Sequence, residues 1–270
     1  MAGQPVVTSS LNPASLSGAC RLVDAELIVE SPHHDTFLVY PANLAGKVHE
    51  GLFEPEFLRA QSLLSGRAQG RGIAHFFEME GERYLLRHYY RGGLVAKLVR
   101  DRYLWQGLEK TRAYRELEIS RGMSNASLPV PRPFAARVIR EGLFYRADFI
   151  SSAIRGANTL TWQLTKGELP EALWGSIGRC LAELHRHGVN HADLNAQNIL
   201  LDDNDTPHVI DFDRAMLMPA AGAWSQGNLK RLRRSLNKEK CKAEQKQQDF
   251  SFSAGNWLSL MAAYDDAISK

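Results

Sequence analysis

The sequence predicts an α+β protein of two lobes, in which an antiparallel sheet with one helix precedes a mainly helical part. Before residue 150, short runs of aromatic and aliphatic residues are separated by glycine turns, a pattern typical of hairpins. After a polar, turn-rich stretch at 151–159, apolar residues recur at helical spacing. We therefore expect an N-terminal extension over 1–35, a first lobe over 36–150 and a second lobe over 151–270.

The first lobe is expected to hold two hairpins and one long helix. Glu80-Gly81 and Glu141-Gly142 each separate two strand-like runs, and glycine is favoured where a tight turn needs a positive φ. The predicted elements are a strand at 22–30 in the extension, a short helix at 54–64, a glycine-rich turn at 65–72, strands at 73–79 and 83–89, a helix at 108–123, and strands at 135–140 and 143–150.

The second lobe is expected to begin with an amphipathic helix. Leu173, Ile177, Leu181 and Leu184 recur at helical spacing after Pro170, and proline is common at a helix start. Further along, we expect a hairpin formed by 199–201 and 208–210, a basic helical segment at 228–240 and a C-terminal helix at 252–268.

Positive charge is concentrated in two segments, although the net charge is only +3. Residues 83–121 hold ten Lys or Arg against four Asp or Glu, and residues 228–242 hold seven against one. Such an uneven distribution favours an anionic partner, such as a nucleotide, a phosphorylated substrate or an anionic lipid. A nucleic-acid partner is not supported, because no known binding module and no regular alternation of aromatic and basic residues is present.

The basic helical segment at 228–240 has two interpretations. Leu229, Leu232 and Leu236 form a narrow apolar stripe with cationic residues turned away from it. A basic amphipathic helix of this kind suits an anionic membrane surface. Three leucines are also what a helix packed on the core would present, and the sequence leaves the choice open.

The remaining composition fits a cytoplasmic protein. The first ten residues lack the basic start and apolar core of a secretory signal, and no apolar run approaches the ~18 residues that cross a bilayer. The three cysteines, Cys20, Cys180 and Cys241, are widely spaced and form no CxxC pair. They are interpreted as reduced thiols, not as a disulfide framework or a zinc site.

The stretch 191-HADLNAQNIL-200 carries the chemistry, together with 209-VIDFD-213. Phosphoryl transfer needs a carboxylate that orients the attacking hydroxyl, and oxygen ligands that hold Mg²⁺ on the phosphates. Asp193, Asn198 and Asp211 fit the kinase pattern H-x-D-L-x-x-x-N followed by a strand and an aspartate. An Asx-capped turn before a hairpin would explain one or two of these residues, but not the whole set in register.

The sequence resembles the lipopolysaccharide core kinases of the protein-kinase-like superfamily over about residues 50–240. The segments that carry the resemblance are 69-QGRG-72, 85-LLRHYYRGGLVAKLVRDRYLW-105, 128-LPVPRP-133 and 191-HADLNAQNILLD-202. The resemblance implies a protein-kinase-like bilobal fold, with ATP as phosphoryl donor and Mg²⁺ as cofactor. It further implies that Asp193 is the catalytic base and that Asn198 and Asp211 are metal ligands.

The nucleotide-binding residues are also implied by the resemblance. Gly70 and Gly72 match a glycine-rich loop that covers the phosphates, although G-R-G alone is equally an ordinary hairpin turn. Arg87 stands where kinases usually have a phosphate-binding lysine; it keeps the charge but differs in reach. Its expected ion-pair partner is Glu116, with Glu118 as the alternative.

The adenine is expected to meet main-chain groups around 148–151, including those of Asp148 and Ile150. Kinases of this superfamily use the hinge between their lobes for this contact.

The acceptor is expected to be a small molecule or a glycolipid and not a peptide. Ala192 replaces the arginine that meets a phosphorylated activation loop in many protein kinases, and no A-P-E follows Asp211. Asp213 replaces a glycine and would either contact the metal or cap the turn. The resemblance implies phosphorylation of 3-deoxy-D-manno-octulosonic acid (Kdo), at its 4-hydroxyl, on a lipid A precursor, by an enzyme bound peripherally to the cytoplasmic face of the inner membrane without a stable protein partner.

The alternatives are a heptose or other sugar kinase, a protein kinase and a pseudokinase binding module. The last is disfavoured because Asp193, Asn198 and Asp211 are all present.

Overall fold

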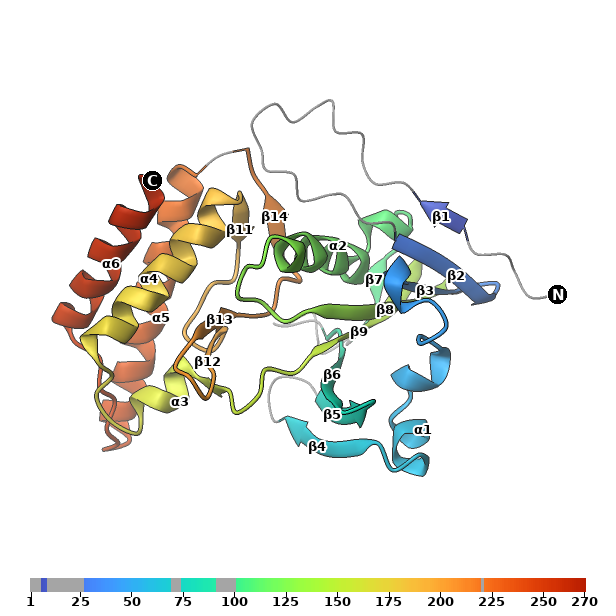
Figure 1. Cartoon of the computed structure of the whole chain (residues 1–270), viewed down its shortest axis with the longest axis horizontal. Helices are drawn as coiled ribbons and strands as arrows, with labels where there is room; N and C mark the ends of the chain where they lie inside the picture. The colour runs from blue at the N-terminus through green and yellow to red at the C-terminus, as the bar shows by residue number, and fades with distance from the viewer. Residues whose placement is uncertain (1–5, 9–26, 69–73, 91–100, 220) are drawn as a thin grey trace. The chain divides into compact units, whose positions relative to one another are not determined.

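The computed structural model describes residues 6–8, 27–68, 74–90, 101–219 and 221–270. Within them the chain forms two compact units (Figure 1). The first contains 27–122 and 132–153, and the second contains 123–131 and 154–270, as far as these residues are described. The change of unit after residue 153 lies close to the lobe boundary expected at 150.

The first unit is built on one antiparallel sheet (Figure 1). Its strand order is β1-β2-β3-β8-β9-β6-β5-β4, and β7 pairs with β9 alongside this path. The strands are β1 (Val6–Thr8), β2 (Leu27–His33), β3 (Thr36–Pro41), β4 (Leu64–Ala68), β5 (Ala74–Met79), β6 (Glu82–His88), β7 (Tyr103–Leu104), β8 (Pro133–Glu141) and β9 (Phe144–Ser152).

Both hairpins predicted from Glu-Gly pairs are present. Glu80 and Gly81, between β5 and β6, have φ angles of 53° and 77°, and Gly142, between β8 and β9, has a φ of 62°. These left-handed conformations cost glycine nothing sterically. The glycine turns therefore allow the chain to reverse direction, so that the two strands of each hairpin pair with each other.

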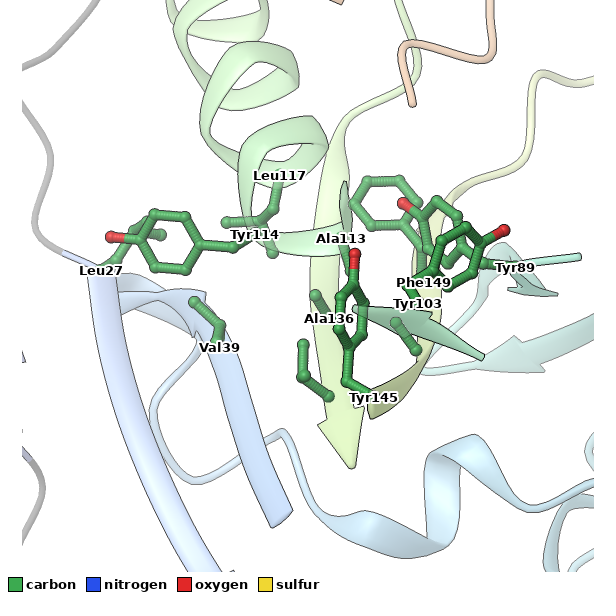
Figure 2. Packing of buried hydrophobic residues seen from close by; sticks show 12 residues of the cluster. Leu27, Val39, Tyr89, Tyr103, Ala113, Tyr114, Leu117, Ala136, Tyr145 and Phe149 are labelled. Carbon is green, nitrogen blue, oxygen red and sulfur yellow. The ribbon is translucent and has the colours of Figure 1, made fainter. Parts of the chain in front are cut away.

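Each face of the sheet has its own apolar core, because side chains alternate along a strand. Helix α2 (Arg112–Asn125) covers one face with Ala113, Tyr114 and Leu117, which belong to a cluster with Ala136 and Phe149 (Figure 2). The other face is covered by residues 42–60, which form the short helices η2 (Ala42–Leu44), η3 (Glu50–Phe53) and α1 (Pro55–Ala60). The cluster on this face includes Ala135 and Ile150 of the sheet, together with Leu44, Val48, Leu52, Phe53 and Leu58. Helix α2 is preceded by η5 (Leu108–Lys110).

The second unit is mainly helical. Its helices are α3 (Leu160–Leu164), α4 (Glu171–Arg186), α5 (Ala223–Gln245) and α6 (Ala254–Ile268), and its short strands are β10 (Asn158–Thr159), β11 (Val189–His191), β12 (Ile199–Leu201), β13 (Pro207–Val209) and β14 (Ala215–Leu217). Helices α4 and α6 approach closely at Gly178, where a Cβ atom would lie 2.2 Å from the Leu260 carbonyl oxygen. A side chain at this position would force the two helices apart.

Two expectations for the N-terminal third were wrong. The strand expected at 22–30 is present as β2 over 27–33, but it pairs with β3 in the sheet of the first unit and does not belong to a separate extension. The helix expected over 54–64 ends at Ala60, and 64–68 forms β4 where a turn was expected. Sheet pairing with β5 outweighed the weak helical pattern there.

The structure decides between the two interpretations of the basic segment, which lies inside α5. Leu229, Leu232 and Leu236 are 2%, 0% and 0% exposed. The apolar stripe is therefore part of the protein's own core and is not available to a membrane. The outward face carries exposed cationic side chains, including Lys230, Arg231, Arg234 and Lys238. Among the helices in the described ranges, none is long and apolar enough to cross a bilayer.

Candidate functional site

The polar loop that follows β11 is held in place by α5. The backbone N–H of His191 donates to Asn228 Oδ1 at 2.9 Å, and the backbone N–H of Ala196 donates to Ser235 Oγ at 3.2 Å. Leu194 and Ala196, which belong to the loop, are buried. These two buried side chains and the two hydrogen bonds fix the backbone on either side of Asp193.

Asn198 is oriented by the backbone of the residue expected to be the base. Its Nδ2 donates to the Asp193 carbonyl oxygen at 3.0 Å, and Asn195 Nδ2 donates to the same oxygen at 2.8 Å. No described residue donates to Asn198 Oδ1, so the amide presents its oxygen as an available ligand. The Asp193 carboxylate, half-buried, accepts no hydrogen bond from the described residues.

Asp211 is brought to this loop by the predicted hairpin. Strands β12 and β13 pair with Ile199 opposite Val209, and the backbone N–H of Ile210 donates to the Asn198 carbonyl oxygen at 3.0 Å. Asp211 itself has a φ of 68°, a conformation that costs a non-glycine residue about 1–3 kcal/mol and is concentrated at functional sites. The hairpin that the sequence predicted between Asn198 and Asp211 is confirmed.

His191 supports Asp211 from behind. Its ring is 2% exposed, and burial lowers its pKa although the Ile210 carbonyl opposes the shift. The neutral ring therefore donates through Nε2 to the Ile210 carbonyl oxygen, 2.9 Å away. The buried ring of Phe212 packs against it with centroids 5.0 Å apart. His191 thus fixes the backbone on both sides of Asp211 without taking part in chemistry itself.

The donor set suits Mg²⁺. Asn198 and Asp211 offer one amide oxygen and one carboxylate, which are hard oxygen ligands. The described ranges contain no group of three His, Cys, Asp or Glu that could hold a metal ion. At nucleotide sites Mg²⁺ takes only one or two protein carboxylates and completes its shell with phosphate oxygens and water.

The first unit contains the expected ion pair. Arg87 Nη2 lies 2.5 Å from Glu116 Oε1, joining β6 to α2. Tyr89, one residue past the end of β6, donates its hydroxyl to Glu116 Oε2. Glu116 is 2% exposed and Arg87 27% exposed. Glu116, not Glu118, is thus the partner of Arg87; the role of Arg87 toward phosphate stays a prediction.

The expected adenine contact at Asp148 and Ile150 conflicts with the sheet. Asp148 lies opposite both His88 and Arg137, and Ile150 lies opposite both Leu86 and Ala135. The main-chain groups of a strand paired on both sides are used by its neighbours.

The side chain of Asp148 belongs to a buried polar network instead. It accepts from His88 Nδ1 at 2.7 Å and from Arg137 Nε at 2.9 Å. His88 Nε2 reaches Asp101 at 3.3 Å, and Arg137 Nη1 reaches Glu54 at 2.5 Å. Sequence reasoning missed this network, which the alternation of Arg87, His88 and Tyr89 on opposite faces of β6 could have indicated.

His88 is expected to make stability pH-dependent. Burial opposes its charged form, but hydrogen bonds and charge from Asp148 and then Asp101 raise its pKa above 6.5. A raised pKa contributes stability that is complete below pH 6.5 and is lost as pH rises through the folded-state value. We expect the difference in thermal midpoint between the wild type and His88→Gln to shrink across that interval. Substitution of the exposed His34 is the control; an equal pH response in both variants would contradict the assignment.

Several expected residues have other surroundings or lie outside the described chain. Gly70 and Gly72 fall between β4 and β5, outside the described residues. In the basic segment 83–121, Arg83 lies over the Phe76 ring and Arg102 pairs with Glu141. Arg91, Lys97 and Arg100 of the same segment lie outside the described residues.

Known proteins resemble this chain over most of its length. A family model described as "Lipopolysaccharide kinase (Kdo/WaaP) family" matches residues 55–264. The chain is 41% identical over 218 residues to the 3-deoxy-D-manno-octulosonic acid kinase of Vibrio vulnificus strain CMCP6, covering 80% of this chain and 92% of the relative. It is 42% identical over 221 residues to the protein of the same name from Stenotrophomonas maltophilia strain K279a, with coverages of 82% and 86%.

A solved structure has the same fold. It is titled "WaaP in complex with acyl carrier protein" and matches with a TM-score of 0.50 at 16% identity, over 80% of this chain and 85% of that one. At this identity the likeness concerns the fold alone. It confirms the two-lobed α+β class expected from the sequence.

Proposed function

Because the chain belongs to the lipopolysaccharide kinase (Kdo/WaaP) family, we propose that it transfers the γ-phosphoryl group of ATP to a hydroxyl of Kdo on a lipid A precursor. The observation that carries the proposal is the identity of about two residues in five with 3-deoxy-D-manno-octulosonic acid kinases over most of both chains. The site geometry supports it, because one hairpin connects Asn198 to Asp211 and the Asn198 side chain donates to the Asp193 carbonyl oxygen.

The chain's own residues divide the chemistry between them. The Asp193 carboxylate accepts the hydrogen bond of the acceptor hydroxyl, orients its oxygen toward the γ-phosphorus and takes the proton as the new O–P bond forms. The bond from the γ-phosphorus to the leaving oxygen breaks, and ADP departs. Bound Mg²⁺ would supply charge neutralisation on the phosphates.

Asn198 and Asp211 are the residues that would hold the cation, and Arg87 would contact the phosphates. Glu116 and Tyr89 fix the guanidinium of Arg87 from the α2 side. A guanidinium has a planar fork of five N–H donors, a geometry that suits both a carboxylate and a phosphate.

Two further parts of the proposal concern the hydroxyl that is phosphorylated and the location of the enzyme in the cell. We assign the phosphate to the 4-hydroxyl of Kdo and the enzyme to the cytoplasmic face of the inner membrane, where a lipid-linked acceptor is accessible. A heptose kinase is the alternative acceptor class.

Mass analysis of the product tests acceptor and position together. With ATP and Mg²⁺, we expect one phosphate on the Kdo of a Kdo-bearing lipid A precursor, and none on a heptose acceptor or a generic protein. Fragmentation of the product should locate the phosphate on the 4-oxygen. Equal turnover of the heptose acceptor would contradict the assignment, and a phosphate on another Kdo hydroxyl would correct the position only.

A further inference from the structure

One end of the first unit's sheet exposes three large apolar side chains side by side. Leu104 of β7 lies opposite Phe144 of β9, and the backbone N–H of Trp105 donates to the Leu143 carbonyl oxygen at 2.9 Å. Leu104, Leu143 and Phe144 are 56%, 75% and 39% exposed. We call these residues, with the arginines described below, the hairpin tip.

The exposure follows from strand alternation and from the length of the covering helices. Tyr103 and Tyr145 belong to the core on the α2 side (Figure 2), so Leu104 and Phe144 point to the opposite face. On that face the apolar cluster covered by η3 and α1 includes Ala135 and Ile150 but none of the tip residues. The described part of the chain thus leaves this end of the face uncovered.

Arginines surround the apolar side chains. Arg102 Nη2 lies 3.1 Å and Arg146 Nη2 2.5 Å from the carboxylate of Glu141. Arg140 Nε donates to the Gly142 carbonyl oxygen at 3.1 Å, and its guanidinium lies over the Trp105 ring. Glu141 is thus shared by two of the three arginines, and these four side chains carry three positive charges and one negative charge.

We propose that the hairpin tip is the surface by which this protein contacts an anionic lipid bilayer. The assignment rests on the proposed function in one respect, namely that the acceptor is lipid-linked. Leucine and phenylalanine at a convex turn can enter the headgroup region, while arginine stems extend along the apolar surface and place their charges at the lipid phosphates. The headgroups of anionic lipids attract the excess positive charge of the arginines.

A bilayer fits this surface better than a second protein. A specific protein interface buries about 800 Å² on each partner, more than three side chains on a projecting turn can supply. Helix α5 carries more charge, but its leucines are buried, so it offers attraction without an apolar anchor. The tip combines both requirements in one place.

Vesicle co-sedimentation of the full chain tests the proposal without acceptor or ATP, so its result does not depend on the proposed activity. The vesicles are phosphatidylglycerol mixed with phosphatidylethanolamine, and phosphatidylcholine alone. We expect binding to the anionic vesicles and a loss of at least about tenfold in affinity on replacing Leu143 and Leu104 with serine. Leu258→Ser is the matched control, because Leu258 is 68% exposed on α6 in the other unit.

A second measurement gives a positive signal on binding, so its result does not depend on whether the serine variants fold. A tryptophan introduced as Leu143→Trp should be quenched by brominated lipids, and one introduced as Leu258→Trp should not. Equal quenching at both positions, or serine variants that bind as tightly as the wild type, would overturn the proposal. A dimer that Leu143→Ser dissociates while vesicle binding persists would assign the tip to a second copy of the chain instead.

Discussion

Replacing Asp193 with asparagine is expected to lower kcat by at least about 100-fold while leaving the fold unchanged. Loss of a positioned base costs typically 10²–10⁴-fold, and an amide can neither take the hydroxyl proton nor attract the hydroxyl as a carboxylate does. The loop does not depend on the carboxylate, because Asn195 and Asn198 donate to the backbone carbonyl of residue 193. The thermal midpoint should therefore stay that of the wild type.

The measurement is steady-state phosphorylation of the Kdo acceptor at saturating ATP, with a melting curve for each variant. Asp205→Asn is the matched control: Asp205 is an exposed carboxylate in the turn between β12 and β13 with a φ of 57°, which asparagine tolerates. It should keep full activity. An Asp193→Asn enzyme that keeps more than about a tenth of wild-type kcat would remove Asp193 from the role of base.

Local sequence signals predicted the hairpins because the turn chemistry is local. Gly81 and Gly142 adopt positive φ angles, and a glycine between two apolar runs is visible in the sequence. β4 was missed for the opposite reason. It is stabilised by pairing with β5, and such pairing can override the propensity of a short segment.

The candidate site likewise has parts that the sequence predicts and parts that it does not. Asn198 and Asp211 lie on one hairpin and were predicted together, since a single turn brings them close. Glu116 was predicted as the partner of Arg87 because it lies on the first-lobe helix, where kinases have the glutamate that pairs with the phosphate-binding lysine. The expected adenine contact conflicts with the pairing of β9 on both edges, which the sequence does not show. The hairpin tip was missed as well, since exposure of Leu143 depends on where η3 and α1 end.

Glu116→Gln is expected to reduce both stability and nucleotide binding. The amide keeps the shape of the side chain and still accepts from the Tyr89 hydroxyl, but it removes the negative charge that pairs with Arg87. Breaking a buried pair costs about 3–5 kcal/mol. Because Arg87 is 27% exposed, solvent screens part of the loss, and we expect about 2–3 kcal/mol. In the same unit, Glu82→Gln breaks the exposed pair with Arg132 and should cost at most about 1 kcal/mol.

The double variant Arg87→Met, Glu116→Gln separates the structural role of the pair from its role toward phosphate. Removing both charges leaves no buried ion unpaired, so the double variant should be more stable than the sum of the two single changes predicts. Its KM for ATP should nevertheless stay raised, because the cation that contacts the phosphates is gone. Urea unfolding and ATP titration of the initial rate give the two readouts. If the double variant recovers both stability and the wild-type KM, Arg87 serves only to hold α2 against β6 and another cation binds the phosphates.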